Sequence, residues 1–263
     1  MKRLHPLLSL GLASALTLGL LCPGAAAVAF SDQDQIVHPD AVTAVADLGL
    51  FAGLPDGSFA PAQNIDRASF ARLVTLMLNG GKIPTLENTA ASFPDTDGHW
   101  AQDCITYCAS LGIISGRSET VFAPDDPVTI AEGARMLLSA LGYRADYEGI
   151  SGATWRITVD ILADQAGLYA DMGSFDSSTP LTRDMAAQMV YNALNIPLVT
   201  YEETTGSDGV KCCTRVEQKD TLLTSVFAQA ESESYGRAAA PFLRAPPLSC
   251  TPVTKPLCRA LYG

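Results

Sequence analysis

Histidine is scarce in this chain, and the motifs of the common enzyme classes are missing from it. Three histidines occur in 263 residues, and only His38 and His99 lie beyond residue 29. There is no G-x-S-x-G turn for a serine nucleophile, no glycine-rich phosphate loop and no H-E-x-x-H zinc motif. We therefore expect a protein that is not an enzyme and has no catalytic residues, no cofactor and no bound metal. A glycosidase pair of carboxylates would escape such a search, but the repeats described below leave too little chain for a catalytic domain.

Positive charge is also in short supply. The chain has 17 lysines and arginines against 28 aspartates and glutamates, which gives a formal net charge of −11. So acidic a protein is not expected to bind nucleic acid through counterion release. It would also repel an anionic partner at long range, so any binding of an anion must come from locally placed arginine or lysine.

Long apolar runs are missing beyond residue 29. The charge-free run Leu7–Leu21 follows a short basic start and precedes the small residues 25–29. This order predicts a secretory signal peptide over residues 1–29, because a membrane span needs about 20 apolar residues. We expect cleavage before Phe30 and a secreted protein without a stable membrane span, with an uncleaved anchor as the alternative. Cleavage removes two cations and no carboxylate, so the formal charge moves from −11 to −13.

Clusters with the spacing of a metal site are missing as well. Cys104 and Cys108 are four residues apart on a predicted helix and so share one face. No matching cysteine or histidine pair completes a site, and we expect buried free thiols. The segment 95–98 hints at a calcium loop, but the remaining ligands are lacking, which favours a capped turn. The other four cysteines beyond residue 29 lie near the C-terminus without metal-site spacing: Cys212, Cys213, Cys250 and Cys258.

What the chain does have is internal repetition. The stretch Leu48–Gly53 recurs as Leu111–Gly116, and Phe59 recurs as Phe122 at the same offset of 63 residues. A third, divergent copy carries Ala-Gly-Leu in the place of Leu-Gly-Ile, and its second half aligns with the second copy at an offset of 53 residues. The predicted segments after the signal peptide are three copies at 30–84, 85–145 and 146–196, and an extension with a tail at 197–263.

Each copy is predicted to contain two helices. The first helices, at about 39–48, 100–111 and 156–166, are each followed closely by a glycine that suits the left-handed residue ending a helix. The second helices carry apolar residues at positions i, i+3, i+4 and i+7, which is typical of an amphipathic helix. Their expected N-caps are Asp66, Thr129 and Thr182. One hairpin cannot bury its apolar stripe alone, so we expect three hairpins around a common axis.

These motifs resemble the S-layer homology (SLH) domain, whose repeat is approximately F-x-D, W-A, x-G-I-I-x-G, D-G-x-F-x-P and T-R-A-E. The resemblance extends over residues 30–196. The stretches that carry it are Phe30-Ser31-Asp32, Phe93-Pro94-Asp95, Trp100-Ala101, Gly112–Gly116, Asp56–Pro61, Phe122-Ala123-Pro124, Asp66–Ser69, Thr129–Glu132 and Thr182–Met185. It implies an all-α, pseudo-threefold body around a central three-helix bundle, with ligand grooves between the lobes.

The resemblance also implies a function and a location. SLH triplets attach exported proteins to bacterial cell walls, and their partner is typically a secondary cell-wall polysaccharide, often acidic or pyruvylated. We therefore expect a secreted, non-catalytic anchor associated with the cell wall or S-layer. The alternative is a structural or adaptor component of a surface layer that acts through protein partners.

The arginine of T-R-A-E is a recurring ligand contact in the family, which points to Arg67 and Arg183. A guanidinium offers a rigid fork of donors to a carboxylate, and a helix N-terminus favours an anion. The second copy has Ile130 instead, so its groove is expected to be weak. The expected ligand-binding residues are Arg67, Arg183, Asp66, Thr182 and Trp100. Loss of either arginine is expected to leave folding nearly intact, because an exposed first-turn arginine contributes little to stability. Alternatively, the two arginines are solvated first-turn residues without a ligand, and Trp100 is a core residue, the placement that its position favours.

The end of the chain differs in character from the repeats. Residues 200–202 suggest a strand, and 221–227 form an apolar run. From Glu231 onward prolines become frequent and the charge turns basic. We expect a disordered C-terminal tail there, and the abrupt change suggests a truncated or frame-altered end of a longer protein.

Overall fold

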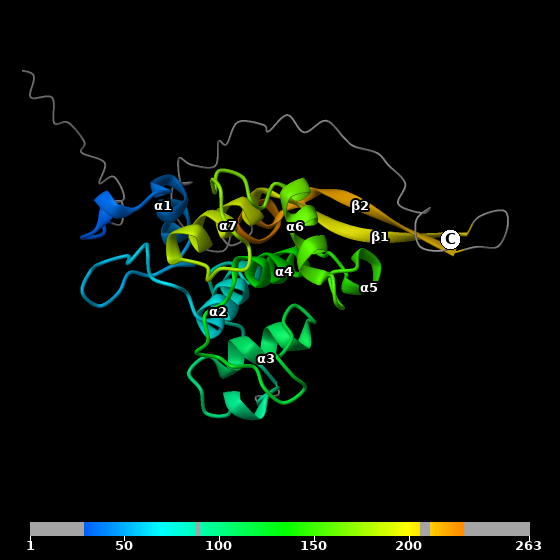
Figure 1. Cartoon of the computed structure of the whole chain (residues 1–263), viewed down its shortest axis with the longest axis horizontal. Helices are drawn as coiled ribbons and strands as arrows, with labels where there is room; N and C mark the ends of the chain where they lie inside the picture. Colours follow the sequence, from blue (N-terminus) through cyan, green and yellow to red (C-terminus); the bar gives the residue numbers. More distant parts are fainter. Residues whose placement is uncertain (1–28, 88–89, 206–210, 229–263) are drawn as a thin grey trace, which may run out of the picture.

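The computed structural model describes residues 29–87, 90–205 and 211–228 (Figure 1). Most of the predicted signal peptide and the predicted disordered tail lie outside the described residues. The described part is mostly helical, with one two-stranded antiparallel sheet. The α-helices are α1 Pro39–Asp47, α2 Arg67–Leu78, α3 Gln102–Ser110, α4 Ile130–Ala140, α5 Ala145–Glu148, α6 Trp155–Ala166 and α7 Arg183–Asn195, and short 3-10 turns lie at Gln33–Gln35 and Pro94–Thr96.

The predicted first helices are α1, α3 and α6, and each ends where expected. Gly49, Gly112 and Gly167 follow them with φ of +73°, +70° and +81°. At such left-handed angles a side chain is disfavoured, and this explains why glycine ends each of these helices. The tight turn after α1 uses the same freedom at Gly57, where φ is +82°.

The predicted second helices are α2, α4 and α7, and their N-caps are confirmed. Asp66 accepts a hydrogen bond from the N–H of Ser69 at 2.6 Å, and Thr182 accepts one from Met185 at 3.3 Å. At α4, Thr129 accepts from the N–H of Glu132, and the Glu132 carboxylate accepts from the N–H of Thr129 in return. This reciprocal capping box satisfies two N–H groups that a helix start leaves unpaired.

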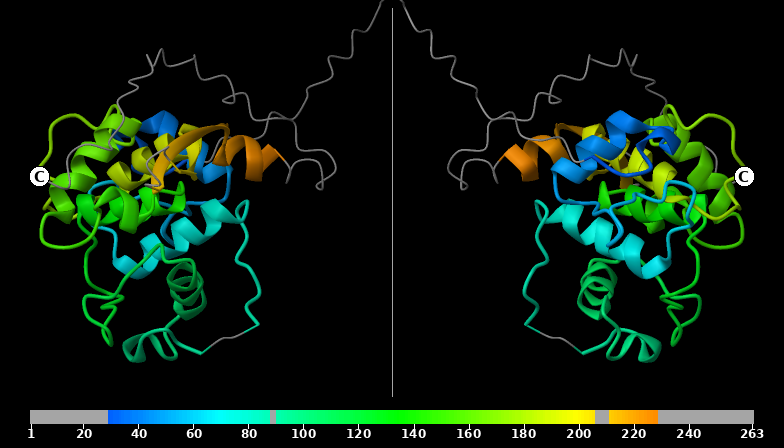
Figure 2. Two further views of the ribbon diagram at one scale, coloured as in Figure 1. Left: turned by 90° about the vertical axis from the view of Figure 1, so that its right-hand side faces the viewer. Right: turned by 90° about the vertical axis from the view of Figure 1, so that its left-hand side faces the viewer.

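Each second helix packs against the first helix of another segment. The closely packed pairs are α2 with α3, α4 with α6, and α7 with α1, and α4 also contacts both α2 and α7. Figures 1 and 2 show α3 beside α2, and α1 beside α7. The apolar stripes lie in the core, with Phe70, Val74, Met77, Leu137, Met189 and Val190 fully buried.

Three residues just before the second helices are joined main chain to main chain. Ile65 N–H donates to the Leu181 carbonyl at 2.9 Å, Leu181 N–H to the Val128 carbonyl at 2.8 Å, and Val128 N–H to the Ile65 carbonyl at 3.1 Å. The bonds form a closed cycle between segments that are far apart in the sequence. All three side chains are buried.

The expectation of an all-α fold is wrong for residues 197–205 and 211–221. These residues form the hairpin of β1 Pro197–Thr205 and β2 Lys211–Thr221, followed by a π-helical turn at Leu223–Phe227 (Figure 1). The strand suggested at residues 200–202 lies within β1. The hairpin docks on the helical body, because Val199 N–H donates to the Leu141 carbonyl at 2.8 Å. A Cβ on Gly142 would lie only 2.2 Å from the Val199 oxygen, so this close approach requires glycine.

Two further expectations concern the helices and the cysteines. None of the helices in the described residues combines the length and apolar character that a membrane crossing requires. Cys104 and Cys108 are both buried free thiols, as predicted. Burial raises the pKa of Cys104, and it raises that of Cys108 to about 12, against hydrogen bonding from Thr75.

Candidate ligand site

Arg67, at the first position of α2, is buried rather than solvated. Only 3% of the residue is exposed. Its Nε donates to the Phe122 carbonyl at 2.9 Å and an Nη to the Ser115 carbonyl at 3.0 Å, and the guanidinium lies 4.5 Å from the centre of the Phe122 ring. The expectation of an exposed arginine is therefore wrong, because the side chain bonds to a loop 48–55 residues further along the chain.

Arg183, at the first position of α7, makes the same set of contacts to an earlier loop. Its Nε donates to the Phe59 carbonyl at 2.7 Å and an Nη to the Ala52 carbonyl at 3.0 Å. The guanidinium stacks 5.0 Å from the ring centres of both Phe51 and Phe59. Phe59 and Ala52 are the residues that the repeat offset of 63 aligns with Phe122 and Ser115, so the two arginines occupy equivalent positions.

The two arginines differ in exposure and in charged partners. Arg183 is half-buried, and within the described residues no carboxylate lies within ion-pair distance of it. Arg67 has the Glu132 carboxylate 3.8 Å away. Desolvation by burial lowers the pKa of both guanidinium groups, opposed by the charge of Glu132 at Arg67 and by that of Asp32 at Arg183. Both remain cations at any physiological pH, since an arginine starts from a pKa above 12.

A small ion network beside Arg67 was not anticipated from the sequence. Arg117 donates to Glu132 at 3.0 Å and to Asp126 at 3.1 Å. Glu132 thus takes part in the cap of α4 and also faces the guanidinium groups of Arg67 and Arg117. The T-R-A-E pattern singled out Glu132, but Arg117 lies in an irregular loop whose path the sequence pattern does not give.

Two aspartates of the F-x-D motif hold the loops that the arginines contact. Asp32 accepts hydrogen bonds from the N–H groups of Phe59 and Ala60 at 2.8 Å, and Asp95 accepts from Phe122 and Ala123 at 3.0 and 2.7 Å. Ala60 and Ala123 have positive φ, at 54° and 58°. The carboxylates offset part of this strain by accepting both N–H groups. Asp95 therefore holds the loop at Phe122 and Ala123 through hydrogen bonds. For residues 95–98 themselves, the sequence favours a capped turn over a calcium site.

Of the other predicted site residues, Asp66 and Thr182 directly precede the two arginines, whereas Trp100 lies far from both in the sequence. Asp66 and Thr182 each use a side-chain oxygen to cap their own helix. Trp100 is 62% exposed, so its placement in the core is wrong, and its ring lies 5.4 Å from that of His99. The second copy has Ile130, which is fully buried and carries no donor for a ligand.

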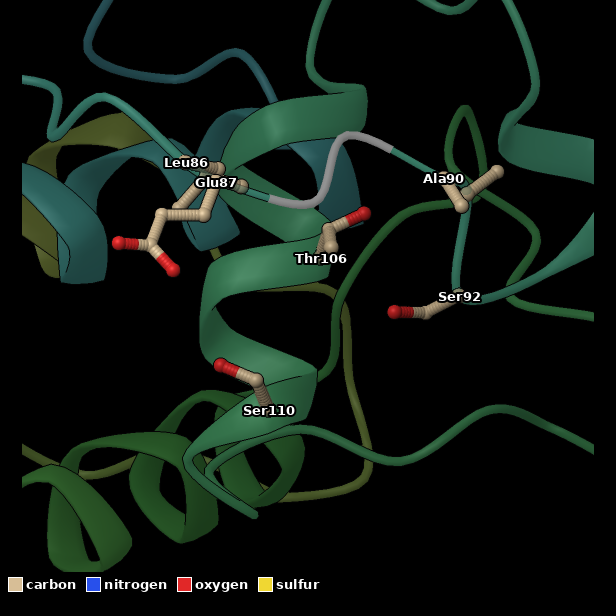
Figure 3. A pocket seen from close by; sticks show the side chains of 7 residues that line it. Leu86, Glu87, Ala90, Ser92, Thr106 and Ser110 are labelled. Atoms are coloured by element: carbon tan, nitrogen blue, oxygen red, sulfur yellow. The ribbon is translucent and has the colours of Figure 1, made fainter.

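A hollow of about 430 Å³ lies elsewhere, beside α3 (Figure 3). It is lined by Leu86, Glu87, Ala90, Ala91, Ser92, Thr106 and Ser110. Thr106 Oγ1 is buried without a hydrogen-bond partner among the described residues. None of the expected ligand-binding residues lines this hollow. It offers no cation, so it does not fit an acidic ligand.

Residues 29–71 and 92–132 match the S-layer homology domain. The matched SLH segments contain Asp32 and Asp95, the Phe59 and Phe122 loops, and Arg67. They fall within the first two predicted copies, whereas the third copy stays a prediction. The match to the SLH domain is thus limited to two segments of the chain.

Relatives that resemble this chain carry surface-related names. This chain is 39% identical over 100 residues to Cell surface glycoprotein 1 of Acetivibrio thermocellus, and the match covers 35% of this chain and 4% of that protein. It is 27% identical over 187 residues to an S-layer protein of Bacillus licheniformis, covering 67% and 21%, respectively. It is 33% identical over 102 residues to a cellulosome-anchoring protein of A. thermocellus, covering 38% and 23%. The chain thus matches less than a quarter of the length of each of these relatives.

One further relative bears an enzyme's name. An uncharacterized cell wall amidase of Bacillus anthracis is 34% identical over 88 residues, which make up 34% of this chain and 16% of that protein. The likeness therefore leaves most of that protein's length unmatched.

Proposed function

We propose that this chain is a non-catalytic module that attaches an exported protein to the bacterial cell wall by binding a secondary cell-wall polysaccharide. The match of residues 29–71 and 92–132 to the SLH domain carries this proposal. The relatives named as a cellulosome-anchoring protein and a cell surface glycoprotein support it. The location proposed with it is the cell wall or S-layer, outside the cell.

The proposal includes a third, divergent SLH copy at residues 146–196 and a pseudo-threefold arrangement around α2, α4 and α7. Equivalent contacts support it. Arg183 of the third copy contacts the Phe59 loop as Arg67 contacts the Phe122 loop. The closed cycle of hydrogen bonds through Ile65, Val128 and Leu181 also takes one residue from each copy.

The proposed ligand is an acidic or pyruvylated glycan, and Arg183 is its main contact. Arg183 combines partial exposure, a rigid fork of donors and the lack of a carboxylate partner among the described residues. At Arg67 the charge is partly offset by Glu132, so we assign that position a weaker role. Asp66 and Thr182 shape the helix starts beside the two arginines. Trp100 offers an exposed ring on which a sugar can stack.

Focused cations resolve the conflict between an acidic chain and an acidic ligand. The formal net charge of −11 repels an anion at long range. At contact, however, a stacked and partly desolvated guanidinium interacts more strongly than the same charge in water. The amidase-named relative does not favour catalysis here, because only 16% of its length is matched.

A second candidate is a component of a surface layer that acts through protein partners. It is favoured by the S-layer protein of B. licheniformis, whose likeness extends over 67% of this chain. In that case, attachment would depend on other surface proteins rather than on a glycan.

A co-sedimentation experiment with purified wall sacculi separates the two candidates. Sacculi are prepared with and without their secondary polysaccharide, and both preparations are freed of protein. We expect the chain to sediment with the complete sacculi and to stay in solution with the stripped ones. Equal sedimentation with both would contradict glycan binding. No sedimentation with either, combined with capture by isolated surface protein, would favour the second candidate.

A further inference from the structure

The contact between α7 and α1 contains a histidine–carboxylate pair that is largely shielded from solvent. His38, just before α1, meets Asp184 of α7 through Nδ1 and Oδ2 at 2.5 Å. Their side chains are 13% and 6% exposed. The repeat alignment puts Ala101 and Ala68 at these positions in the contact of α3 with α2, and both alanines are fully buried. The pair is therefore a feature of one contact, the one that joins the beginning of the described chain to its third segment.

Both ring nitrogens of His38 face hydrogen-bond acceptors. Nδ1 faces the Asp184 carboxylate, and Nε2 lies 2.9 Å from the main-chain carbonyl of Asp171. A carbonyl oxygen can only accept, so Nε2 must carry a proton. Neutral imidazole has a single N–H, which leaves Nδ1 with a lone pair directed at the carboxylate. A neutral ring beside an ionised carboxylate therefore leaves one of these two contacts without a proton.

The other oxygen of the Asp184 carboxylate is also hydrogen-bonded. Its Oδ1 accepts hydrogen bonds from the N–H groups of Val37 and His38 at 3.0 and 3.1 Å. The neighbouring Arg183 directs its guanidinium to the Phe59 loop, and among the described residues no hydrogen bond or ion pair joins the His38 ring to Asp40 or to the carboxylate of Asp171. Asp184 is thus the charged group that faces the ring from the elements packed around it.

We propose that His38 and Asp184 hold one extra proton between them and form a proton-dependent latch that fastens α1 to α7. With that proton, both ring nitrogens donate and every contact is satisfied. Without it, two acceptors face each other either at the part-buried contact with Asp184 or at the exposed contact with Asp171, which is unfavourable. Asp184 of the latch directly follows Arg183 at the start of α7.

The latch makes stability depend on pH in a defined direction. In an unfolded chain a histidine releases its proton near pH 6.5. Below that value both states hold the proton, and the latch contributes in full. Above it the unfolded chain lacks the proton of the proposed latch, so the proposal predicts that stability falls as pH rises. The unfolding equilibrium constant then increases by up to about tenfold per pH unit.

Asp184→Asn gives a sharp test of the proton count. The asparagine keeps one oxygen for the N–H groups of Val37 and His38, but it presents N–H donors where the second carboxylate oxygen was. A neutral His38 can then accept at Nδ1 and still donate from Nε2. This variant should stay folded and lose the pH dependence, whereas His38→Gln should lose it through removal of the ring.

The experiment uses the full chain and two readouts. Urea unfolding between pH 5.5 and 8.5 is compared for the parent, Asp184→Asn, His38→Gln and the control His99→Gln, whose ring faces a largely exposed Asp125 at 3.4 Å. Proton–nitrogen NMR of the rings reports directly which nitrogens are protonated.

We expect two protonated nitrogens on His38 in the folded parent at pH 7.5 and one in Asp184→Asn, with the parent's pH dependence kept in His99→Gln. A single protonated nitrogen in the folded parent would overturn the proposal, and so would an equal pH dependence in the parent and His38→Gln. Neither readout involves wall binding, so the result is independent of the proposed function.

Discussion

Arg183 contacts Phe59 through both the main chain and the ring of that residue. Its Nε donates to the Phe59 carbonyl at 2.7 Å, and its guanidinium carbon lies 5.0 Å from the ring centre. The two residues are 124 positions apart in the sequence. The arginine proposed to bind an acidic ligand therefore also joins the third segment to the first, so we expect changes at this position to affect both binding and folding.

The first prediction concerns stability. Arg67→Ala and Arg183→Ala each remove two hydrogen bonds to carbonyl groups and a stacking contact. We expect each change to lower the free energy of unfolding by about 1–3 kcal/mol, with the larger loss at the more buried Arg67. Urea unfolding measures this quantity.

Arg144→Ala is the matched control, because the Arg144 side chain is 57% exposed and its ion pair with Asp146 is a surface pair. Solvent screens such pairs, so they contribute little to stability. Arg117 is unsuitable as a control, since it shares Glu132 with Arg67. If both arginine variants unfold like the parent, the carbonyl contacts are not important for stability.

The second prediction concerns wall binding. Arg183→Ala should weaken binding to complete sacculi about ten- to hundredfold, as expected for loss of a charge-assisted hydrogen bond. Arg183→Lys should restore only part of it, because lysine keeps the charge without the planar fork. Arg67→Ala should weaken binding less, since Glu132 already offsets its charge.

These affinities are measured by co-sedimentation at a temperature where circular dichroism shows each variant to be folded. Arg144→Ala again serves as the control and should bind like the parent. Equal losses for Arg183→Ala and Arg144→Ala would show that only the total positive charge matters, and the site assignment would then be wrong.

The third prediction concerns acid. Although desolvation opposes it, hydrogen bonds from Phe122 and Ala123 lower the pKa of Asp95 below its usual value. A carboxyl with a lowered folded-state pKa stabilises the fold above its unfolded value of about 3.9, and this contribution is lost as the pH falls below that value. Asp95→Asn should therefore be less stable than the parent at pH 7, and the difference should shrink towards pH 3.

Unfolding curves at pH 3, 5 and 7 test this prediction. Asp97→Asn is the control, because Asp97 is an exposed carboxyl two residues further along. A difference between the parent and Asp95→Asn that is the same at all three pH values would mean that the ionised carboxylate is not what holds the Phe122 loop.

The fourth prediction concerns thiol reactivity. Cys108 is fully buried, and its pKa is raised to about 12. The thiolate is the reactive form, so iodoacetamide at pH 8 should leave Cys108 unmodified in the folded chain. Peptide mapping by mass spectrometry should find it alkylated only after denaturation, while the partly exposed Cys213 reacts in the native state. Rapid native alkylation of Cys108 would show that the contact between α2 and α3 opens readily.

Local features of the chain were determined by the sequence itself. The bonds between Thr129 and Glu132 join residues three apart, and Gly112 ends its helix through its own φ of +70°. Such features depend on the propensities of a few neighbouring residues. The repeat offset also indicated which segments are equivalent, and the apolar stripes indicated which helix faces are buried. The two helices of each copy could therefore be predicted from the sequence.

Only the tertiary structure decided what surrounds each candidate side chain. The position of Arg67 at a helix start is visible in the sequence, but its burial depends on carbonyl groups 48 and 55 residues away. The pairing of His38 with Asp184 spans 146 residues, and the docking of β1 depends on the missing side chain of Gly142. These contacts form between segments that the chain brings together only on folding, and no local propensity specifies which main-chain group will face which side chain. For that reason the sequence identified Arg67 and Arg183 as equivalent, whereas the structure distinguished them by their surroundings. Arg67 is buried beside a carboxylate, and Arg183 is half-buried with no carboxylate partner in the part of the chain that the structure describes.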